Sequence, residues 1–276
     1  GGAQTYTGGL TAAAPSATTL NGTISTSSSL SFKNVTLASS TTLTSTGSGG
    51  ISFSSTIDGG HDLTINTSGA TTIGGAVGGS TPLASLTTNS GGSLAINTTS
   101  IKTTGAQSYG EAATLGANVS LDTTLRSSAG ANIGFGSTLS GASSARNLTL
   151  NAGTGGQISI AGAMTTNIDT ITITESGGAT FGGAVTASNS VVISSTASGA
   201  SVVFSGALTT GTLTTAAQGK HGARDLDAPI GFRGINERIV LVPALPHIER
   251  TEPLDPNDQP FGLSELNHSP GFGTIC

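Results

Sequence analysis

A five-residue motif recurs along the chain about every 21 residues, and this repetition restricts the possible folds more than any other feature. The motif reads aromatic residue or Ile, any residue, Gly or Ser, Ala or Thr, and then an aliphatic residue. Its clear copies are Phe53-Ser-Ser-Thr-Ile57, Ile73-Gly-Gly-Ala-Val77, Phe135-Gly-Ser-Thr-Leu139, Ile160-Ala-Gly-Ala-Met164, Phe181-Gly-Gly-Ala-Val185 and Phe204-Ser-Gly-Ala-Leu208. One longer gap, between Ile73 and Phe135, corresponds to three units, and weaker copies near Leu94 and Leu115 divide it.

The repetition extends toward the N-terminus and includes longer units. Phe32 precedes Phe53 by one unit, and Leu10 precedes Phe32 by another. Residues 2–6, Gly-Ala-Gln-Thr-Tyr, return as Gly-Ala-Gln-Ser-Tyr at 105–109, five units later. These spacings predict about ten repeats of roughly 20–25 residues over residues 1–218.

Composition indicates that the repeats consist of strands and turns. The chain has 42 Gly among 276 residues, and residues 1–218 carry only ten charged side chains. Gly costs roughly 1 kcal/mol relative to Ala inside a helix, and β-branched Thr loses rotamer freedom there. Alternating runs such as Leu63-Thr-Ile65 and Ile171-Thr-Ile173 are typical of half-buried strands. The apolar fraction of the chain, 35%, and the near neutrality of residues 1–218 argue against disorder.

A repeat of this length, built from short strands and Gly-rich turns, predicts an all-β fold of the parallel β-helix (β-solenoid) type. One coil cannot bury its own apolar face, but stacked coils share a continuous core. We expect the first motif residues to point inward as a ladder along one wall, with small residues permitting close packing between them. The predicted core ladder is Phe32, Phe53, Ile73, Phe135, Ile160, Phe181 and Phe204.

These repeats resemble the β-strand repeats of very large exported bacterial proteins similar to filamentous haemagglutinin. Three runs carry the resemblance: Gly-Ala-Gln-Thr-Tyr-Thr-Gly at 2–8, Thr-Leu-Thr-Ser-Thr-Gly-Ser-Gly-Gly-Ile-Ser-Phe at 42–53, and Leu-Thr-Ile-Asn-Thr-Ser-Gly-Ala-Thr-Thr-Ile-Gly-Gly-Ala-Val at 63–77. The resemblance covers roughly residues 1–218. It implies a right-handed parallel β-helix, export across the outer membrane, and a role in adhesion or biofilm formation. It supplies no catalytic residue.

The composition changes after Gln218. Residues 219–276 hold 13 of the 23 charged residues and seven of the nine prolines, and the repeat disappears. We predict a charged, Pro-rich, irregular C-terminal tail that partly caps the last coil or is disordered, with one strand candidate at residues 238–242. Cys276, the only cysteine, excludes an internal disulfide. Because the chain begins inside repeat-like sequence, we expect it to be a processed or excised piece of something longer.

Charge and hydropathy exclude several classes of partner. The net charge is −5, no basic cluster occurs and aromatic residues are few, so we expect no nucleic-acid partner. No apolar stretch approaches the roughly 20 residues of a membrane-spanning helix. We expect no cofactor and no metal.

The densest polar cluster, Asp58-Gly-Gly-His61-Asp62, has two interpretations. It can be a carboxylate pair with a histidine base or a cation site, or it can be a turn between two strands. Asp-Gly-Gly between strands favours the turn. A polysaccharide-cleaving β-helix needs several acids converging on one face. The six acids of residues 1–218 are scattered, so we expect no enzyme.

The leading functional hypothesis is therefore a structural or adhesive segment of an exported bacterial cell-surface protein, located outside the cell or on its surface. It would act as a rigid stalk or as a multivalent surface for host or bacterial glycans or proteins. The alternatives are a filament or matrix subunit that associates end to end and, as a third hypothesis, a carbohydrate-active β-helix enzyme.

Overall fold

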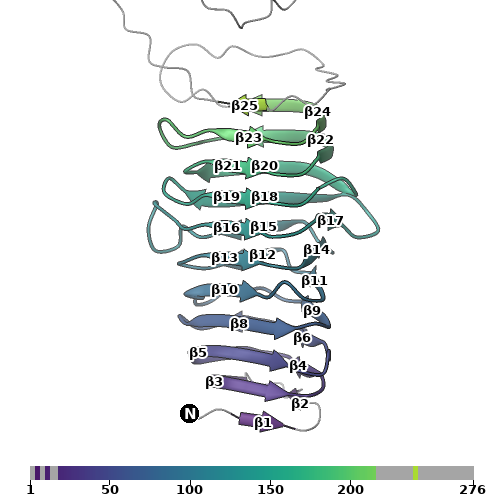
Figure 1. Cartoon of the computed structure of the whole chain (residues 1–276). Helices are drawn as coiled ribbons and strands as arrows, with labels where there is room; N and C mark the ends of the chain where they lie inside the picture. The colour runs from purple at the N-terminus through teal and green to yellow at the C-terminus, as the bar shows by residue number, and fades with distance from the viewer. Residues whose placement is uncertain (1–3, 7–9, 13–17, 216–238, 242–276) are drawn as a thin grey trace, which may run out of the picture. The chain divides into compact units, whose positions relative to one another are not determined.

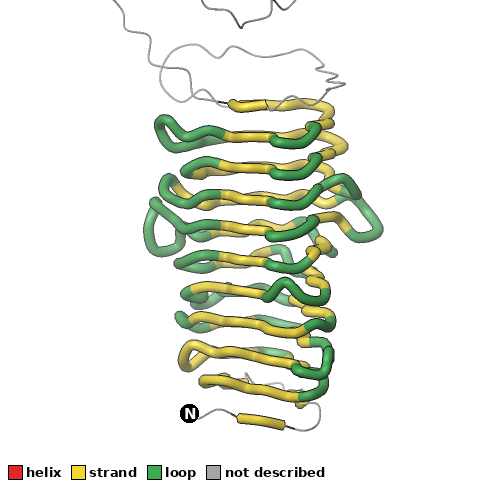
Figure 2. The backbone as a smooth tube through the Cα atoms, viewed as in Figure 1, coloured by secondary structure: helices red, strands yellow, loops and turns green. Residues whose placement is uncertain are grey.

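The chain forms a parallel β-solenoid. The computed structural model describes residues 4–6, 10–12, 18–215 and 239–241, all within one compact unit, Gly1–Ala244. Three sheets wrap around a common interior (Figure 1), and loops join their strands at the corners (Figure 2). Strands and turns make up these residues without a helix, so no helix among them can span a membrane. The predicted fold class is confirmed.

The three sheets form three faces of the solenoid. The long face has twelve strands, in the pairing order β1 (Gln4–Tyr6), β3 (Thr18–Thr26), β5 (Val35–Ser45), β8 (Asp62–Thr67), β10 (Ser85–Thr88), β13 (Gln107–Tyr109), β16 (Ile133–Phe135), β19 (Ile158–Ile160), β21 (Ala179–Phe181), β23 (Val202–Phe204) and β25 (Ile239–Leu241), with β7 (Ile57–Asp58) paired to β5. The second face comprises β2 (Leu10–Ala12), β4 (Leu30–Phe32), β6 (Ile51–Phe53), β9 (Ala70–Ile73), β11 (Ser93–Ile96), β14 (Ala112–Leu115) and β17 (Leu139–Gly141). The third face comprises β12 (Ser100–Lys102), β15 (Val119–Asp122), β18 (Arg146–Gly153), β20 (Ile168–Ser176), β22 (Val185–Ile193) and β24 (Leu208–Thr215).

One turn crosses the long face, then the second face, then the third, as β13, β14 and β15 do in sequence. Neighbouring turns pair in parallel: Leu86 pairs with Gln107, which pairs with Ile133. The turns vary in length because loops of different size interrupt them at the corners, and these loops are green in Figure 2. Ten successive parallel strands, from β1 to β23 in the pairing order of the long face, make about nine turns, close to the ten predicted.

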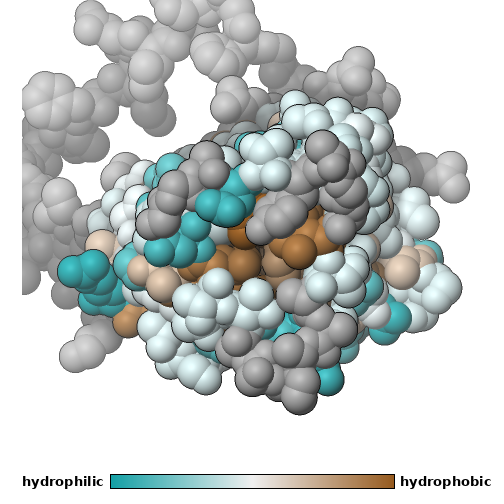
Figure 3. Space-filling view, turned by 90° about the horizontal axis from the view of Figure 1, so that it is seen from below, coloured by the Kyte–Doolittle hydropathy of each residue, from teal (hydrophilic) through white to brown (hydrophobic). Residues whose placement is uncertain are grey.

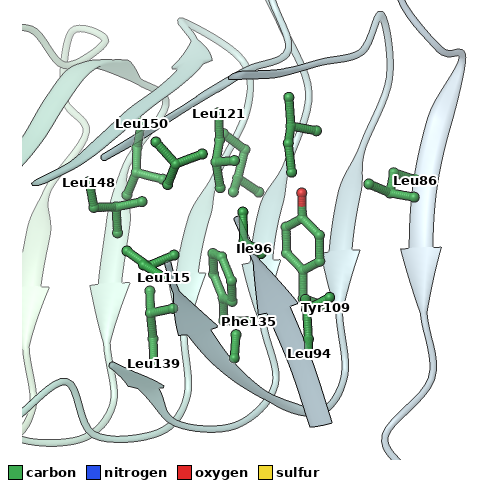
Figure 4. Packing of buried hydrophobic residues seen from close by; sticks show 14 of the residues in the cluster. Leu86, Leu94, Ile96, Tyr109, Leu115, Leu121, Phe135, Leu139, Leu148 and Leu150 are labelled. Atoms are coloured by element: carbon green, nitrogen blue, oxygen red, sulfur yellow. The ribbon is translucent and has the colours of Figure 1, made fainter. Parts of the chain in front are cut away.

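The core follows from the alternation of apolar and polar residues along each strand. In β8, Leu63 and Ile65 are fully buried whereas Thr64 and Asn66 between and beyond them are partly exposed. Seen end-on from below, apolar residues lie in the centre and polar residues surround them (Figure 3). Figure 4 shows the middle turns, where leucines of the second and third faces pack around Tyr109 and Phe135.

The predicted core ladder is buried but does not form one wall. All seven side chains are at most 3% exposed. Phe32, Phe53 and Ile73 are register partners on the second face. The other four are register partners on the long face: Phe135, Ile160, Phe181 and Phe204. The rings of Phe181 and Phe204 stack with centroids 4.7 Å apart, and those of Phe32 and Phe53 with centroids 5.6 Å apart.

The motif marks a corner of the solenoid rather than a face, and for this reason the seven predicted ladder residues are divided between two faces. In the early turns its five residues lead from the second face toward the third, as from Phe53 to Ile57. Ile57 pairs with the start of β5 but also bridges to Val77, which bridges to Ile101 of β12 on the third face. In the later turns the same pattern leads from the long face to the second face, as from Phe135 to Leu139. Both corners need a short link of small residues, because successive corners stack closely. A Cβ on Gly183, for example, would lie 2.6 Å from the Ala163 nitrogen.

Part of the predicted C-terminal segment is described. The strand expected at residues 238–242 is confirmed as β25, which pairs antiparallel with β23 through Val203 and Val240. It is the one antiparallel pairing among the described strands. The predicted boundary at residue 218, the rest of the tail and Cys276 lie outside the described residues.

Candidate functional site: the outward hydroxyl columns

The long face carries a straight outward column of small, mostly hydroxyl-bearing side chains. Each long-face strand in the pairing order from β3 to β23 contributes one residue, which is in register with the contributed residue of the next strand. The column consists of Thr23, Thr42, Thr64, Thr87, Ser108, Gly134, Ser159, Thr180 and Val203. These positions face away from the core because their strand neighbours point inward, and all of them except Val203, which is 6% exposed, are at least partly exposed. All but Gly134 and Val203 are Thr or Ser, so this face presents hydroxyls at the spacing of the turns.

The other two faces carry similar columns. On the second face the column is Thr11, Ser31, Ser52, Thr72, Ala95, Thr114 and Ser140. On the third face it is Ser100, Ser120, Thr149, Thr172, Val192 and Thr214. Hydroxyls of neighbouring turns bond to one another in places: the Ser52 hydroxyl donates to the Ser31 hydroxyl at 3.1 Å.

These columns can bind only through weak, repeated contacts. Hydroxyls donate and accept hydrogen bonds but carry no charge. Successive members lie about 4.8 Å apart, the spacing of neighbouring strands. The charged side chains of residues 18–215 are dispersed, and no three His, Cys, Asp or Glu among the described residues gather into a group that could hold a metal ion. The chemistry of the surface is therefore extended rather than focused.

The Asp58–Asp62 cluster spans the last residue of β7, the link formed by residues 59–61 and the first residue of β8, as the turn interpretation predicted. The His61 amide donates to the Gly59 carbonyl at 2.8 Å, which closes the link. Gly59 has φ +121, and a Cβ there would meet the Leu37 oxygen at 2.5 Å, so glycine is required at this position.

Both carboxylates of this cluster bind neighbouring turns. Asp58 Oδ1 accepts hydrogen bonds from the amides of Ser80 and Thr81 at 2.7 and 3.1 Å. Asp62 accepts from the Ser85 hydroxyl of the following turn at 2.6 Å and from the Ser40 hydroxyl of the preceding turn at 2.9 Å. The acids therefore tie successive turns together at the edge of the long face. None of these bonds joins either carboxylate to His61.

A buried polar cluster escaped the sequence analysis. Tyr109 is 1% exposed and donates its hydroxyl to Gln107 Oε1 at 3.1 Å. The Gln107 amide in turn donates to the Ile101 and Asp122 carbonyls, each at 3.2 Å. Tyr109 also stacks on Phe135 with ring centroids 4.7 Å apart. This network satisfies the amide of a polar side chain inside the core.

Glu111, two residues after Tyr109, is also buried, with 1% of its surface exposed. Its Oε2 accepts a hydrogen bond from the Thr88 hydroxyl at 2.5 Å. Burial raises the pKa of Glu111 above its ordinary range, against the opposing effect of this hydrogen bond. The pKa of Tyr109 is raised as well, chiefly by burial and further by the charge of Glu111.

Comparison of the chain with protein-family models, with curated proteins and with solved structures gives no match.

Proposed function

We propose that the chain is a structural and adhesive segment of an exported bacterial cell-surface protein. The observation that carries this proposal is the register of the outward hydroxyl columns, which continue over successive turns on all three faces. The repeat resemblance to proteins similar to filamentous haemagglutinin supports the same proposal, as does the solenoid itself. A stack of turns joined by parallel pairing is a stiff spacer, and its outer surface grows with every added turn.

The partners we propose are glycans or proteins of host or bacterial surfaces. A single hydroxyl contributes little, because each hydrogen bond to a partner replaces one to water. Many such contacts acting together can raise the apparent affinity by about 10² to 10⁴ without a strong single site. Thr and Ser columns also bind without charge, so the binding should depend little on ionic strength.

Two alternatives receive less support. End-to-end association into a filament needs free strand edges at both ends of the stack, but β25 pairs with β23 on the long face, at the edge that a following parallel turn would use. A carbohydrate-active enzyme needs acids free to act on a substrate. Asp58 and Asp62 are instead engaged with neighbouring turns. We therefore propose an adhesive rather than a catalytic role.

The test compares the same protein at low and high display density. Purified chain would be offered to a panel of bacterial and host polysaccharides and surface proteins, once as free monomer and once at high density on beads. We expect binding at high density only, and no release of reducing ends from any polysaccharide. A column variant, Thr64→Ala with Thr87→Ala and Thr180→Ala, should lose binding if the long face is used. The matched variant of the second face, Thr72→Ala with Thr114→Ala and Ser140→Ala, tests whether binding uses that face instead.

Two results would contradict the proposal. The first is saturable, tight binding by the free monomer that neither column variant alters. The second is release of reducing ends that disappears in the Asp58→Asn, Asp62→Asn double variant, which would establish an enzyme.

A further inference from the structure

Glu111 occupies a corner position that elsewhere holds a small residue. It is the third residue of the segment Tyr109-Gly-Glu-Ala-Ala113, which leads from the long face to the second face. At the same corner of the later turns the third motif residue is Ser137, Gly162, Gly183 and Gly206. At Gly162 a Cβ would lie 2.4 Å from the Ser137 carbonyl carbon, because the corner below is directly beneath it. A long side chain at such a position needs space that the other corners do not leave.

The preceding corners provide that space. In the turn below, five residues separate Thr88 from Leu94, and in the turn before that, five separate Ile65 from Thr71. Only three residues separate Tyr109 from Ala113. The stack therefore changes from wide to narrow corners at this point. The carboxyl of Glu111 lies within the wide corners, with the hydroxyls of Thr88 and Thr71 facing it.

The hydrogen bonds to the carboxyl do not offset the cost of burying its charge. The Thr88 hydroxyl and the backbone amides of Gly110 and Glu111 stabilise the carboxylate, but burial outweighs them and raises the pKa of Glu111. Glu111 Oε1 and the facing Thr71 Oγ1 are both buried, and neither makes a hydrogen bond of good geometry. The charge of Glu111 contributes to raising the pKa of the neighbouring Tyr109 hydroxyl, and the facing corners, residues 66–70 and 89–93, contribute only uncharged residues. No cation among the described residues balances a carboxylate at this position. An unpaired buried charge is far costlier than a buried neutral carboxyl.

We propose that Glu111 is a proton-dependent lock between the wide-corner and narrow-corner turns. The turns around it pack fully while the carboxyl carries a proton. They separate locally at this corner when the carboxyl loses its proton, because the ion then needs water. The solenoid thus contains one turn whose cohesion depends on pH, in a chain whose other described turns lack a buried acid.

The direction of the pH dependence follows from linkage. In the unfolded chain Glu111 titrates near its ordinary pKa, about 4.3. Burial raises the pKa in the folded chain, so between the two values the folded state binds more protons than the unfolded state. The contribution of Glu111 to stability is therefore greatest below about pH 4 and falls as pH rises toward the folded pKa.

The test uses the full chain and the Glu111→Gln variant, which keeps the shape of the side chain but cannot ionise. Thermal unfolding would be followed by circular dichroism from about pH 4 to about pH 9. We expect similar melting temperatures for both proteins at the acid end. With rising pH the wild type should melt progressively below Glu111→Gln. The matched control is Asp62→Asn, which removes an exposed carboxyl and should not reproduce this divergence.

Parallel melting curves for the wild type and Glu111→Gln across this range would overturn the proposal. A melting temperature of the wild type that rises relative to that of Glu111→Gln as the pH increases would also overturn it. A direct measurement on the unaltered protein covers the case in which Glu111→Gln does not fold. Carboxyl carbon-13 spectra of glutamate-labelled chain should contain one resonance that titrates well above the others. If every glutamate titrates in the ordinary range, the lock does not exist.

Discussion

Replacing Phe181 with alanine tests the packing of the core most sharply. Phe181 is fully buried in the long face, and its ring stacks on Phe204 at 4.7 Å with an angle of 8° between the planes. Phe→Ala substitutions in cores cost about 3–5 kcal/mol, because the lost burial adds to the cavity left behind. The stacked pair contributes about 0.5–1.5 kcal/mol of that loss. We therefore expect Phe181→Ala to lower the free energy of unfolding by about 4 kcal/mol.

The assay is equilibrium unfolding in urea, followed by circular dichroism. Thr180→Ala is the matched control, since its side chain lies on the opposite, exposed side of the same strand and should change stability by no more than about 0.5 kcal/mol. Phe181→Asp should destabilise more than Phe181→Ala, because it also buries an unpaired charge. In a solenoid each turn contacts only its neighbours, so amide exchange should accelerate first in β19, β21 and β23.

A loss below about 1 kcal/mol for Phe181→Ala, indistinguishable from that of Thr180→Ala, would refute the assignment of this ring to the core.

Three further predictions concern individual positions. Gly183→Ala should lower the free energy of unfolding by about 2 kcal/mol or more, because its Cβ would lie 2.6 Å from the Ala163 nitrogen. Gly134→Ala should be neutral or slightly stabilising, because its Cβ would meet nothing within 4 Å. Thermal unfolding of the two variants under the same conditions tests both predictions. Ser176→Ala should stabilise by about 1 kcal/mol in urea unfolding, because the Ser176 hydroxyl is buried without a hydrogen-bond partner, and a destabilised variant would reveal an overlooked partner. Asp58→Ala should cost about 1 kcal/mol in the same assay, because the amides of Ser80 and Thr81 lose their common acceptor, and an unchanged midpoint would count against those bonds.

Repetition in the sequence was sufficient to predict the solenoid and the burial of its large apolar residues. Phe53 and Phe181 occupy the same place in the motif, and both point into the core because strand alternation allows no other choice. The sequence could not predict that they lie on different faces. A link of three small residues forms either corner equally well, and the long gap between Ile73 and Phe135 does not reveal that the motif has moved from one corner to the other.

The sequence predicted that Thr and Ser side chains lie on the surface of the strands, but it did not predict which of them align between neighbouring turns. An alternating strand places Thr on the surface, yet only the pairing of turns aligns Thr64 with Thr87. Glu111 was harder to recognise, because a single acid among scattered acids resembles a solvated surface residue. One signal was available: it replaces Gly or Ser at the third motif position, in the segment that begins at Tyr109.

The distance between two positions far apart in one outward column tests the central claim most directly. Thr42 and Thr180 stand in the long-face column, separated by six register steps. Spin labels on Thr42→Cys and Thr180→Cys, in a chain whose Cys276 is changed to Ser, would report the distance by double electron–electron resonance. Six steps of about 4.8 Å predict a narrow distribution centred near about 29 Å. A broad distribution centred near about 65 Å, as expected for a flexible Gly-rich chain of this length, would contradict the stacked, in-register solenoid on which the proposed function depends.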